Sequence, residues 1–291
     1  MPTLTSAQAE GLDVFRRGKV RDTFQLPDGT LLMVATDRIS AFDVVLPTPI
    51  PDKGRVLTQM SRWWFGQTGD IVPNHLLPGD ELPDGVPEDW ADRTMHVRRA
   101  QRIDIECVVR GFISGSGWKE YRESGTLAGE QIPGVLKESG RLAAPRFTPA
   151  MKNDDGHDVN ISREQLAKLV GGDLASQLES VSLRLFDMAT GRCESAGVYL
   201  ADTKFEFGFV DGKLILIDEV FTPDSSRFWE ISEWREGQPV TSFDKQFVRD
   251  YLETLKWDKT PPGPELPPEV VQGTAERYRE AAQRICGVVI S

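Results

Sequence analysis

Long apolar runs, cysteine pairs and clustered histidines are all missing from this sequence of 291 residues. No apolar stretch approaches the roughly 18 residues with which a helix crosses a bilayer, and the first residues lack the basic start and apolar middle of a signal peptide. The three cysteines stand apart with no CxxC pair, which is typical of reduced, structural thiols. The three histidines do not have the spacing of a zinc site. We therefore expect a cytoplasmic protein with no membrane partner.

An excess of basic residues is also absent, because the net charge is −11. This charge argues against a nucleic-acid partner, which would need a basic face. It does not exclude small anionic ligands, since charges act over only about 8–10 Å at physiological salt. A local cluster of Lys and Arg in an acidic protein can still bind phosphate.

Local patterns indicate both strands and helices. Two β-rich runs flank Pro27-Asp28-Gly29, which is a turn signature, and residues 94–115 are typical of strands. Residues 55–67 place apolar side chains at helical spacing. Glycines at residues 115–117 form a loop that enters a short helix.

The second half of the chain carries further helical signals. Ser162 and Gln165 form a capping box that opens a helix to about Val170. Asp173 is expected to cap a longer helix directly after it. Two more helices are expected, over residues 242–257 and in a last segment that ends near Gly287.

Strand pairs in the first part and helices with a hairpin in the second predict an α+β fold with mainly antiparallel sheets, rather than a doubly wound sheet. We place the division of the chain near residue 110. Residues 1–110 are expected to form a β-rich N-terminal lobe, and residues 111–291 a C-terminal α+β lobe that ends in helices.

The segment ADTKFEFGFVDGKLILIDEV (201–220) predicts a β-hairpin with an apolar interior and charged distal ends. The charged side chains are Asp202, Lys204 and Glu206 on the first arm and Asp218 and Glu219 on the second. Side chains alternate between the two faces of a strand, so the register of the hairpin decides which charges share a face.

The length of the hairpin loop fixes that register. A two-residue Asp211-Gly212 loop pairs Val210 with Lys213 and puts Glu206 and Asp218 on opposite faces, with Asp218 among the phenylalanines. A three-residue loop shifts the register by one residue and puts both carboxylates on the face opposite the phenylalanines. We expect the three-residue loop, because it leaves no carboxylate in the core.

Two carboxylates on one face repel each other unless a proton or a cation lies between them. Oxygen ligands of this kind suit Mg²⁺, which usually takes one or two carboxylates together with substrate phosphates. The alternative is a solvated face on which Lys204 neutralises Glu206, and periodicity does not choose between the two.

Six segments closely resemble the SAICAR synthase family: GKVRDTF (18–24), ATDRISAFDVVLPTPIPDKG (35–54), ECVVRGFISGSGWKEY (106–121), DTKFEFG (202–208), IDEVFTPDSSRFW (217–229) and SFDKQFVRDYL (242–252). They occur in the family's order and span roughly residues 11–257. The SGSGW motif and the length of the chain resemble the longer, yeast-like branch of the family.

The resemblance implies an ATP-dependent ligase of purine synthesis. In this family ATP phosphorylates the carboxylate of a carboxyaminoimidazole ribotide (CAIR), and the amine of L-aspartate then expels phosphate to give the succinocarboxamide SAICAR. It also implies two α+β parts with the nucleotide in the cleft between them, distantly like ATP-grasp enzymes and inositol-phosphate kinases. The N-terminal lobe would bind nucleotide, and the C-terminal lobe would hold the metal and CAIR. A monomer is expected rather than a homodimer.

The same resemblance assigns residues to ligands. It implies ATP contacts for Gly18, Lys19, Arg21, Glu106 and Lys152. Glycine lets the backbone approach phosphates, and cations can meet them.

The metal and CAIR positions follow from the same match. Glu206 and Asp218 would bind Mg²⁺, while Arg110, Ser116 and Arg227 would hold the phosphate and ribose of CAIR. Arginine suits bidentate binding of phosphate.

Lys204 and Asp202 are the expected catalytic residues, in contact with the reacting carboxylate and the imidazole amine, against the alternative of a structural ion pair. His157 is expected to be structural rather than a general base.

Asp37, Arg38 and Asp43 match the family without a role that we can derive, and the alternatives are a place near the aspartate substrate or a structural role in holding their loop. Asp158 lies with Lys152 in a long irregular loop that could close over the nucleotide, against the alternative of a solvated loop.

Two other functions share some of these features. A small-molecule kinase would stop at phosphoryl transfer and would not need Arg110, Ser116 and Arg227. A non-catalytic nucleotide-binding protein would tolerate the loss of one metal carboxylate, and this sequence retains both.

Overall fold

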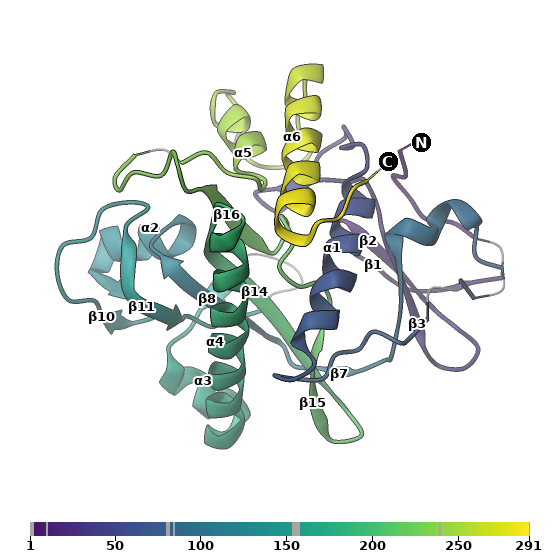
Figure 1. Cartoon of the computed structure of the whole chain (residues 1–291), viewed down its shortest axis with the longest axis horizontal. Helices are drawn as coiled ribbons and strands as arrows, with labels where there is room; N and C mark the ends of the chain where they lie inside the picture. Colours follow the sequence, from purple (N-terminus) through teal and green to yellow (C-terminus); the bar gives the residue numbers. More distant parts are fainter. Residues whose placement is uncertain are drawn as a thin grey trace.

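A computed structural model describes residues 3–9, 11–79, 82–83, 85–152, 158–238 and 240–290. Its first sheet has four antiparallel strands in the order β1-β2-β3-β6 and lies on the right in Figure 1. The strands are β1 (Asp13–Arg17), β2 (Arg21–Gln25), β3 (Leu31–Ala35) and β6 (Thr94–Val97). The predicted turn at Pro27-Asp28-Gly29 joins β2 to β3 and is confirmed, with Gly29 at φ 84°.

The second sheet has eight strands and forms the centre of the molecule (Figure 1). Its main path is β13-β12-β8-β14-β15, while β11 pairs with β8 and both β16 and β7 pair with β14. The pairings between its described strands are antiparallel. The strands are β7 (Gln101–Arg102), β8 (Ile105–Phe112), β11 (Arg141–Phe147), β12 (Ala150–Met151), β13 (Val159–Asn160), β14 (Val198–Val210), β15 (Lys213–Ile217) and β16 (Ser226–Glu230). Two short ribbons complete the described strands: β4 (Ser40–Ala41) with β5 (Val44–Val45), and β9 (Thr126–Leu127) with β10 (Glu130–Gln131).

Helices cover one face of the central sheet and close the space between the sheets (Figure 1). The helical segments are α1 (Lys53–Thr68), the 3₁₀ helix η1 (Glu88–Arg93), α2 (Gly115–Ser124), α3 (Arg163–Val170), α4 (Gly172–Ser195), α5 (Gln246–Glu253), α6 (Pro268–Ala281) and the π-helical turn η2 (Ala282–Cys286). The expected α+β fold with mainly antiparallel sheets is confirmed.

One apolar core joins most of these elements. Leu178 and Leu185 of α4 pack with Phe205 and Phe207 of β14, and the same cluster includes Trp64 of α1. Residues of the four-stranded sheet and of α6 belong to this cluster as well. The division of the chain near residue 110 stays a prediction, and position 110 itself lies within β8.

The predicted capping box is confirmed. The Ser162 hydroxyl accepts a hydrogen bond from the Gln165 amide at 3.2 Å, and the Gln165 side chain accepts one from the Ser162 amide at 2.7 Å. The prediction that Asp173 caps the next helix is wrong, because α4 already begins at Gly172 and Asp173 lies in its first turn. There its carboxylate still interacts favourably with the helix dipole.

Two further helix predictions differ in accuracy. The helix expected over residues 242–257 is shorter, since α5 spans Gln246–Glu253. The last helical segment ends at Gly287 as expected, with that glycine at φ 71°.

The predicted three-residue loop of the hairpin is wrong. Val210 pairs with Lys213, which leaves a two-residue turn of Asp211 and Gly212. Both turn residues have positive φ, 51° and 73°. This is the type I′ geometry, whose twist matches that of the two strands and which Asp-Gly adopts readily.

The even register has a consequence for both arms. Leu214 and Leu216, rather than the neighbouring isoleucines, join the phenylalanine face of the hairpin in the core. Asp218 nevertheless stays out of the core, because β15 ends at Ile217 and Asp218 takes a left-handed φ of 69°. The side chain of Asp218 is 25% exposed. The alternation of side chains between the two faces therefore ends at Ile217, one residue before Asp218. Whether the hairpin loop has two or three residues does not decide the direction of the Asp218 side chain.

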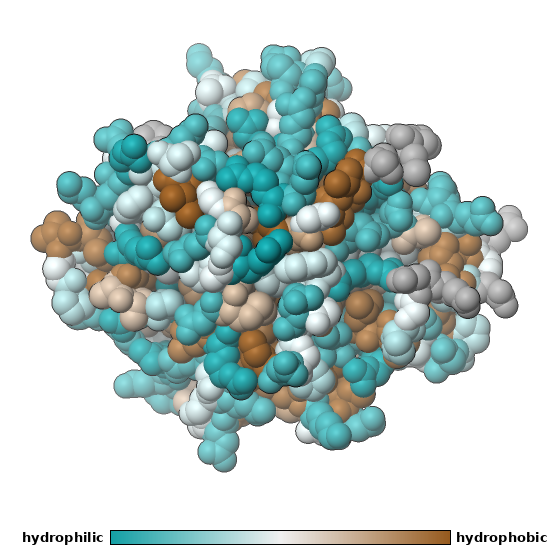
Figure 2. Space-filling view, viewed as in Figure 1, coloured by the Kyte–Doolittle hydropathy of each residue, from teal (hydrophilic) through white to brown (hydrophobic). Residues whose placement is uncertain are grey.

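The outer surface is polar over most of the face seen in Figure 2, with apolar residues scattered between hydrophilic ones. Among the described residues, no helix has the length and apolar character needed to span a membrane.

Candidate active site

An open cleft of about 1180 Å³ runs between the two sheets and continues towards α5. It is lined by every residue that the sequence analysis assigned to a ligand or to catalysis: Gly18, Lys19, Arg21, Glu106, Arg110, Ser116, Lys152, Asp202, Lys204, Glu206, Asp218 and Arg227. Asp43 and Asp158, for which no role was derived, line it too, whereas Asp37 and Arg38 do not. Residues far apart in the sequence therefore meet in one cavity.

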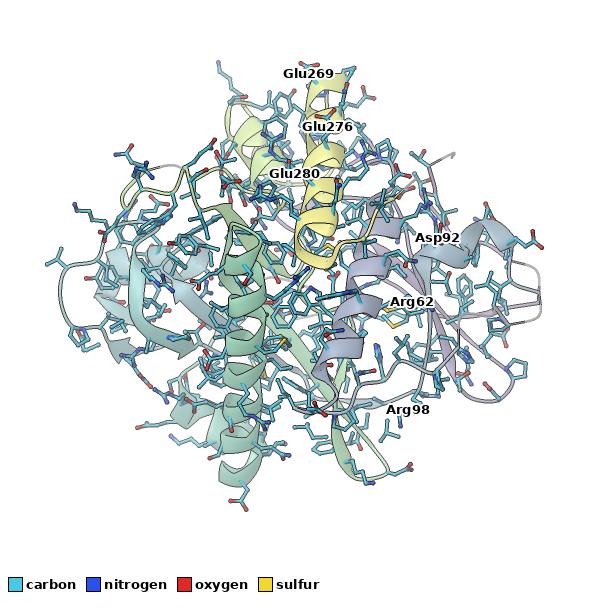
Figure 3. All side chains as sticks on the ribbon, in the orientation of Figure 1. Arg62, Asp92, Arg98, Glu269, Glu276 and Glu280 are labelled. Atoms are coloured by element: carbon cyan, nitrogen blue, oxygen red, sulfur yellow. The ribbon has the colours of Figure 1, made fainter. Side chains whose placement is uncertain are left out.

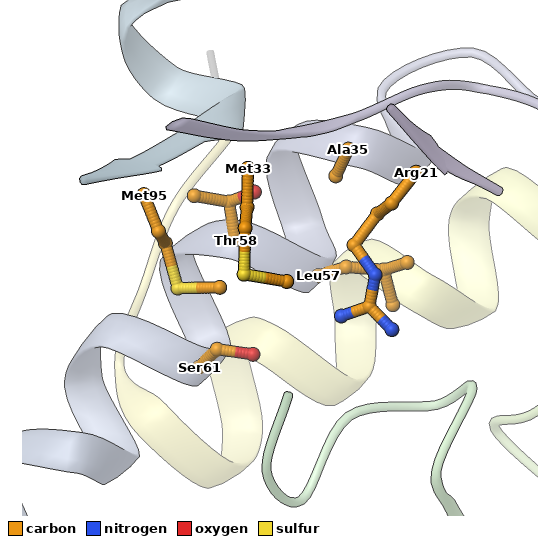
Figure 4. A pocket seen from close by; sticks show the side chains of 7 residues that line it. All are labelled: Arg21, Met33, Ala35, Leu57, Thr58, Ser61 and Met95. Carbon is orange, nitrogen blue, oxygen red and sulfur yellow. The ribbon is translucent and has the colours of Figure 1, made fainter. Parts of the chain in front are cut away.

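Arg21 enters this cleft from β2. Its stem lies beside a narrow gap between the small sheet and α1, lined also by Met33, Leu57 and Met95, and this gap has no room for a water molecule (Figure 4). Because the stem of Arg21 packs on that side, its guanidinium group extends to the acidic end of the hairpin. It donates a hydrogen bond to Asp218 at 2.6 Å.

The pKa values of the two hairpin carboxylates shift in opposite directions. Burial alone would raise the pKa of Asp218, but the charges of Arg21, Lys152 and Lys204 lower it below its usual value. Burial and the negative charge of Asp218 raise the pKa of Glu206 above its usual value. The two carboxylates therefore repel each other, and the effect appears in the pKa of Glu206.

Lysines lie between the carboxylates at this end. Lys152 forms an ion pair with Glu206 and lies 3.8 Å from Glu106. Lys204 binds the same Glu106 at 2.9 Å. Burial lowers the pKa of Lys204, but the charges of Glu106 and Glu206 outweigh burial and raise it above its usual value. Lys204 is thus a permanent cation rather than a proton acceptor.

The donor set at this end fits Mg²⁺ in part. Among the residues that the structure describes, no group of three or more His, Cys, Asp or Glu side chains is placed to hold a metal ion. Glu206 and Asp218 supply two carboxylates, and Mg²⁺ commonly takes its other ligands from phosphates and water. Burial, and after it the negative charge of Asp218, raises the pKa of Glu206, and a bound divalent cation would favour the charged form of both carboxylates.

The other end of the same strand face is cationic. Asp202 of β14 lies directly opposite Arg110 of β8 and opposite Arg227 of β16 in the sheet. Its Oδ2 atom binds Arg110 at 2.9 Å and Arg227 at 2.6 Å. The Ser114 hydroxyl donates to the same oxygen at 3.3 Å. One carboxylate thus orients two guanidinium groups, and a net positive charge remains.

The glycine-containing first turn of α2 completes this end. Gly115 has φ 53°, and a Cβ atom there would lie 2.4 Å from Nη2 of Arg227, so only glycine fits. The next residue, Ser116, accepts a hydrogen bond from Arg110 at 2.9 Å. The prediction of a glycine loop at residues 115–117 is wrong, because these residues form the first turn of α2, and this turn and the two arginines form one unit.

The loop of Gly18 and Lys19 is fastened by Arg38. The Arg38 guanidinium donates to the carbonyl oxygens of Gly18 at 2.9 Å and Lys19 at 3.0 Å, and it forms an ion pair with Asp22 at 2.9 Å. Lys19 itself is paired with Asp43 at the edge of the cleft. These contacts agree with the alternative in which Arg38 has a structural role.

Asp37 also has a structural role. Its buried carboxylate accepts hydrogen bonds from the amides of Leu4 at 2.8 Å and Gly54 at 3.0 Å, and it pairs with Arg93 at 3.1 Å. It joins the N-terminal segment to the start of α1. His157 lies outside the described residues.

The sequence analysis missed a second set of charged residues at the cleft: Lys53, Glu219, Asp224, Lys245 and Arg249. All but Lys53 line the cavity, and Lys53 binds Asp224 from behind it. Lys245 and Arg249 fall within a segment that was matched to the family, and their four-residue spacing within the helix expected over residues 242–257 was the signal available.

Comparisons with known proteins show the family of this chain. The family model described as SAICAR synthetase matches residues 14–264. The chain belongs to the SAICAR synthetase family. A phosphoribosylaminoimidazole-succinocarboxamide synthase of Thermodesulfovibrio yellowstonii is 51% identical over 276 residues, which cover 93% of this chain and 94% of the relative. That of Thermobifida fusca is 49% identical over 286 residues, which cover 96% of this chain and 93% of the relative.

Solved structures of the SAICAR synthetase family give the same result. The SAICAR synthase of Saccharomyces cerevisiae complexed with SAICAR has a TM-score of 0.90 and 39% sequence identity, covering 99% of this chain and 100% of that chain. A SAICAR synthetase in complex with ADP has a TM-score of 0.71 at 24% identity, covering 95% of this chain and 99% of that chain, and shows the shared fold. The expected likeness to the yeast-like branch agrees with the higher TM-score and identity.

Proposed function

We propose that this protein joins L-aspartate to CAIR and forms SAICAR, ADP and phosphate from ATP. Its curated relatives at about 50% identity carry this activity in their names, and the yeast structure was obtained with SAICAR. The observation that carries the proposal is that an arginine pair, from β8 and β16, and a carboxylate pair, from β14 and the end of β15, line a single cleft beside the polar face of β14. This arrangement suits a phosphorylated substrate at one end and a metal-bound nucleotide at the other.

The reaction has two steps. An oxygen of the CAIR carboxylate attacks the γ-phosphorus of ATP, which forms an acyl phosphate and releases ADP. The neutral amine of L-aspartate then attacks the acyl carbon and expels phosphate, and its extra proton leaves to a carboxylate or phosphate oxygen. Such transfer depends mainly on positioning and on neutralisation of charge.

We assign ATP to the end of the cleft formed by Gly18, Lys19 and Arg21, with Glu106 and Lys152 beside it. The ordered Gly18 loop supports this assignment, because Arg38 fixes its carbonyl groups and leaves Lys19 at the cleft edge. A protein of the same fold is described in complex with ADP.

Glu206 and Asp218 would hold Mg²⁺, which supplies neutralisation of phosphate charge when bound. These carboxylates are now paired with Lys152 and Arg21. Lys152 and Arg21 are therefore close enough to contact phosphate groups bound beside these two carboxylates.

Arg110, Ser116 and Arg227 would hold the phosphate and ribose of CAIR, in agreement with their common hydrogen-bond network. Lys204 would neutralise the reacting carboxylate as a fixed cation. Asp202 was expected to contact the imidazole amine, and its bonds to both arginines support an additional role in holding them.

We also place the enzyme in the cytoplasm as a monomer. Its cysteines are free and buried, as in a reducing compartment. Light scattering that gives the mass of one chain would support the monomer, and twice that mass would overturn it.

Release of ADP tests the proposal against a kinase that stops at phosphoryl transfer. ADP is measured with CAIR alone, with L-aspartate alone and with both. Fast release with both substrates, together with SAICAR as product, is expected. Equally fast release without L-aspartate would favour the kinase, and no release under any condition would contradict both enzymes.

A further inference from the structure

The guanidinium of Arg38 has five N–H donors, and the structure gives each of them an acceptor. Nε donates to the carbonyl oxygen of Lys19 at 3.0 Å. Nη2 donates to the carbonyl oxygen of Gly18 and to the carboxylate of Asp22, both at 2.9 Å. Nη1 donates to the carbonyl oxygen of Thr5 at 2.6 Å and to Asp22 at 3.2 Å. One side chain thus joins the loop before β2 to the N-terminal end of the chain.

The N-terminal segment, residues 3–9, is held by two buried carboxylates. The amide of Leu4 donates to the carboxylate of Asp37 at 2.8 Å, and the carbonyl oxygen of Leu4 accepts from the amide of Asp37 at 2.7 Å. The amide of Ala7 donates to the carboxylate of Asp22 at 2.9 Å. Ala7 is fully buried in an apolar cluster of the small sheet and η1. The carbonyl oxygen that the guanidinium binds therefore lies between two anchored residues.

The Gly18 loop separates Arg38 from the cleft. Gly18, Lys19 and Val20 line the cleft, whereas Arg38 does not. A peptide unit is planar and trans, so its carbonyl and N–H groups point in opposite directions. Because Arg38 binds the carbonyl oxygens of Gly18 and Lys19, the N–H groups of Lys19 and Val20 are fixed on the side away from Arg38. Backbone N–H groups that point the same way form a site for phosphate oxygens.

Charge and orientation at position 38 are separate properties. Arg38 and Arg17 both pair with the buried carboxylate of Asp22, at 2.9 and 3.2 Å, so the charge has an electrostatic role of its own. Lysine keeps that charge but carries it on one nitrogen. Only the planar guanidinium reaches two successive carbonyl oxygens and a carboxylate at once. A change from arginine to lysine therefore removes the orientation and keeps the charge.

On the basis of the proposed function, we propose that Arg38 is a positioning residue for the nucleotide and that the N-terminal segment acts with it. Arg38 orients the Gly18 loop for the phosphates of ATP, and the segment holds Arg38 through the carbonyl oxygen of Thr5. The cationic end of the cleft, which we assign to CAIR, lies outside this network. Only nucleotide binding should therefore depend on it.

Arg38→Lys tests the positioning role. It should raise the KM for ATP, and the Kd for ADP measured by isothermal titration calorimetry, about tenfold, because a loop that is no longer held must be ordered when the nucleotide binds. The KM values for CAIR and L-aspartate should stay within about twofold of the wild type. Thermal unfolding shows whether the variant is folded at the assay temperature.

Two other arginines provide matched controls. Arg284 donates to the carbonyl oxygens of Ala196 at 3.1 Å and Gly197 at 3.3 Å and pairs with Glu230 at 2.6 Å, which is an arrangement of the same kind. Arg62 of α1, labelled in Figure 3, donates to two carbonyl oxygens at 3.4 and 3.5 Å. Arg284→Lys and Arg62→Lys should lower stability at most and leave the Kd for ADP unchanged, because none of these carbonyl groups belongs to a residue that lines the cleft.

The N-terminal segment is tested at Ala7. Ala7→Leu places a larger side chain at a fully buried position and should displace the segment, which raises the Kd for ADP about fivefold. Gln8→Leu introduces the same side chain at the exposed neighbouring position and should not change the Kd. Added to Arg38→Lys, Ala7→Leu should cause little further rise, because both changes act through the same hydrogen bond.

The wild-type protein gives a test that does not depend on the folding of a variant. Coupling between two sites is reciprocal, so ADP should stabilise the N-terminal segment by the factor with which the segment favours ADP. Saturating ADP should therefore slow hydrogen exchange of the Leu4 and Ala7 amides about fivefold.

Each outcome bears on one part of the proposal. A folded Arg38→Lys protein that binds ADP as tightly as the wild type overturns the positioning role, and so does an equal rise in all three KM values. A Kd for ADP that Ala7→Leu leaves unchanged overturns the role of the segment. If neither variant folds, exchange of the two amides that does not respond to ADP overturns the proposal. A wild type that binds ADP but forms no SAICAR would contradict the proposed function alone, and one that does not bind ADP would contradict both.

Discussion

The two ends of the polar face of β14 differ in the balance of charge. At Asp202 two arginines surround one carboxylate, whereas at Glu206 the carboxylates of Glu106, Glu206 and Asp218 lie among lysines and Arg21. The two ends are four residues apart, or about 13 Å along a strand. A single strand thus has an end that suits a bound anion, at Asp202, and an end that suits a bound cation, at Glu206. A bound phosphate group and a nucleotide can together span the distance between the two ends.

The difference arises from the partner strands. At Asp202 both neighbours, β8 and β16, place an arginine opposite the carboxylate. Towards Glu206 the neighbour β16 has ended and β15 takes its place. The carboxylate of Asp218 then enters from the end of β15. Side chains on the same face of β14 therefore have cationic partners at one end and additional carboxylates at the other.

The largest effect is expected at the acidic end. Asp218→Asn should abolish turnover, with a loss of at least about 1000-fold in kcat, because a neutral amide is a poor ligand for Mg²⁺. The fold should stay nearly intact. Steady-state kinetics and thermal unfolding measure the two properties.

A matched control lies in the turn of the same hairpin. Asp211→Asn removes an exposed carboxylate outside the cleft, and Asn tolerates the positive φ of that turn. It should keep wild-type turnover. Normal turnover of Asp218→Asn would refute the metal role.

The cationic end should respond through binding of CAIR. Arg227→Met should raise the KM for CAIR about 100-fold, with little change in the KM for ATP, because a guanidinium that faces phosphate is lost. Arg141→Met, which changes an exposed arginine outside the cleft, is the control and should leave both KM values unchanged. An equal rise in the KM for ATP would contradict the claim that the two ends bind different substrates.

Asp202→Asn sharpens the comparison within the cationic end. If Asp202 mainly holds the arginines, the variant should raise the KM for CAIR about tenfold and lower kcat less, because the amide keeps the shape but not the charge. A large fall in kcat at unchanged KM would instead indicate direct contact with the reacting amine. Initial rates at varied CAIR distinguish the two.

The smallest effect is expected away from the cleft. Ser162→Ala removes the capping box of α3 and should lower the free energy of unfolding by about 1 kcal/mol without a change in kcat. Ser176→Ala, whose hydroxyl bonds within α4 at 2.9 Å, should change stability less. Urea unfolding measures both. A loss of activity in Ser162→Ala would mean that α3 supports the cleft more closely than its contacts indicate.

Local patterns predicted many elements of the fold. The capping box of Ser162 and the turn at Gly29 have strong local signals, and both were confirmed. The hairpin register was predicted wrongly, since the choice depended on keeping Asp218 out of the core. The left-handed backbone conformation of Asp218, directly after β15, keeps its carboxylate out of the core without a longer loop. A change at a single backbone position does not alter the alternation of apolar and polar residues, so the sequence pattern does not indicate it.

The site shows the same limit. The resemblance to the family selected residues that all line one cleft, but it did not predict the contacts that hold them. Arg38 and Asp37 act through backbone groups of distant segments, which no spacing reveals. The network of Asp224 with Lys53 and Tyr278 joins residues separated by up to 225 positions, so only the tertiary structure discloses it.

The central claim is that the two ends act on one carboxylate, which receives the phosphoryl group before the amine attacks. CAIR labelled with ¹⁸O in its carboxylate tests this directly. The account predicts that the released phosphate contains one ¹⁸O atom for each labelled carboxylate that reacts, measured by mass spectrometry. Phosphate without label, formed together with SAICAR, would contradict it.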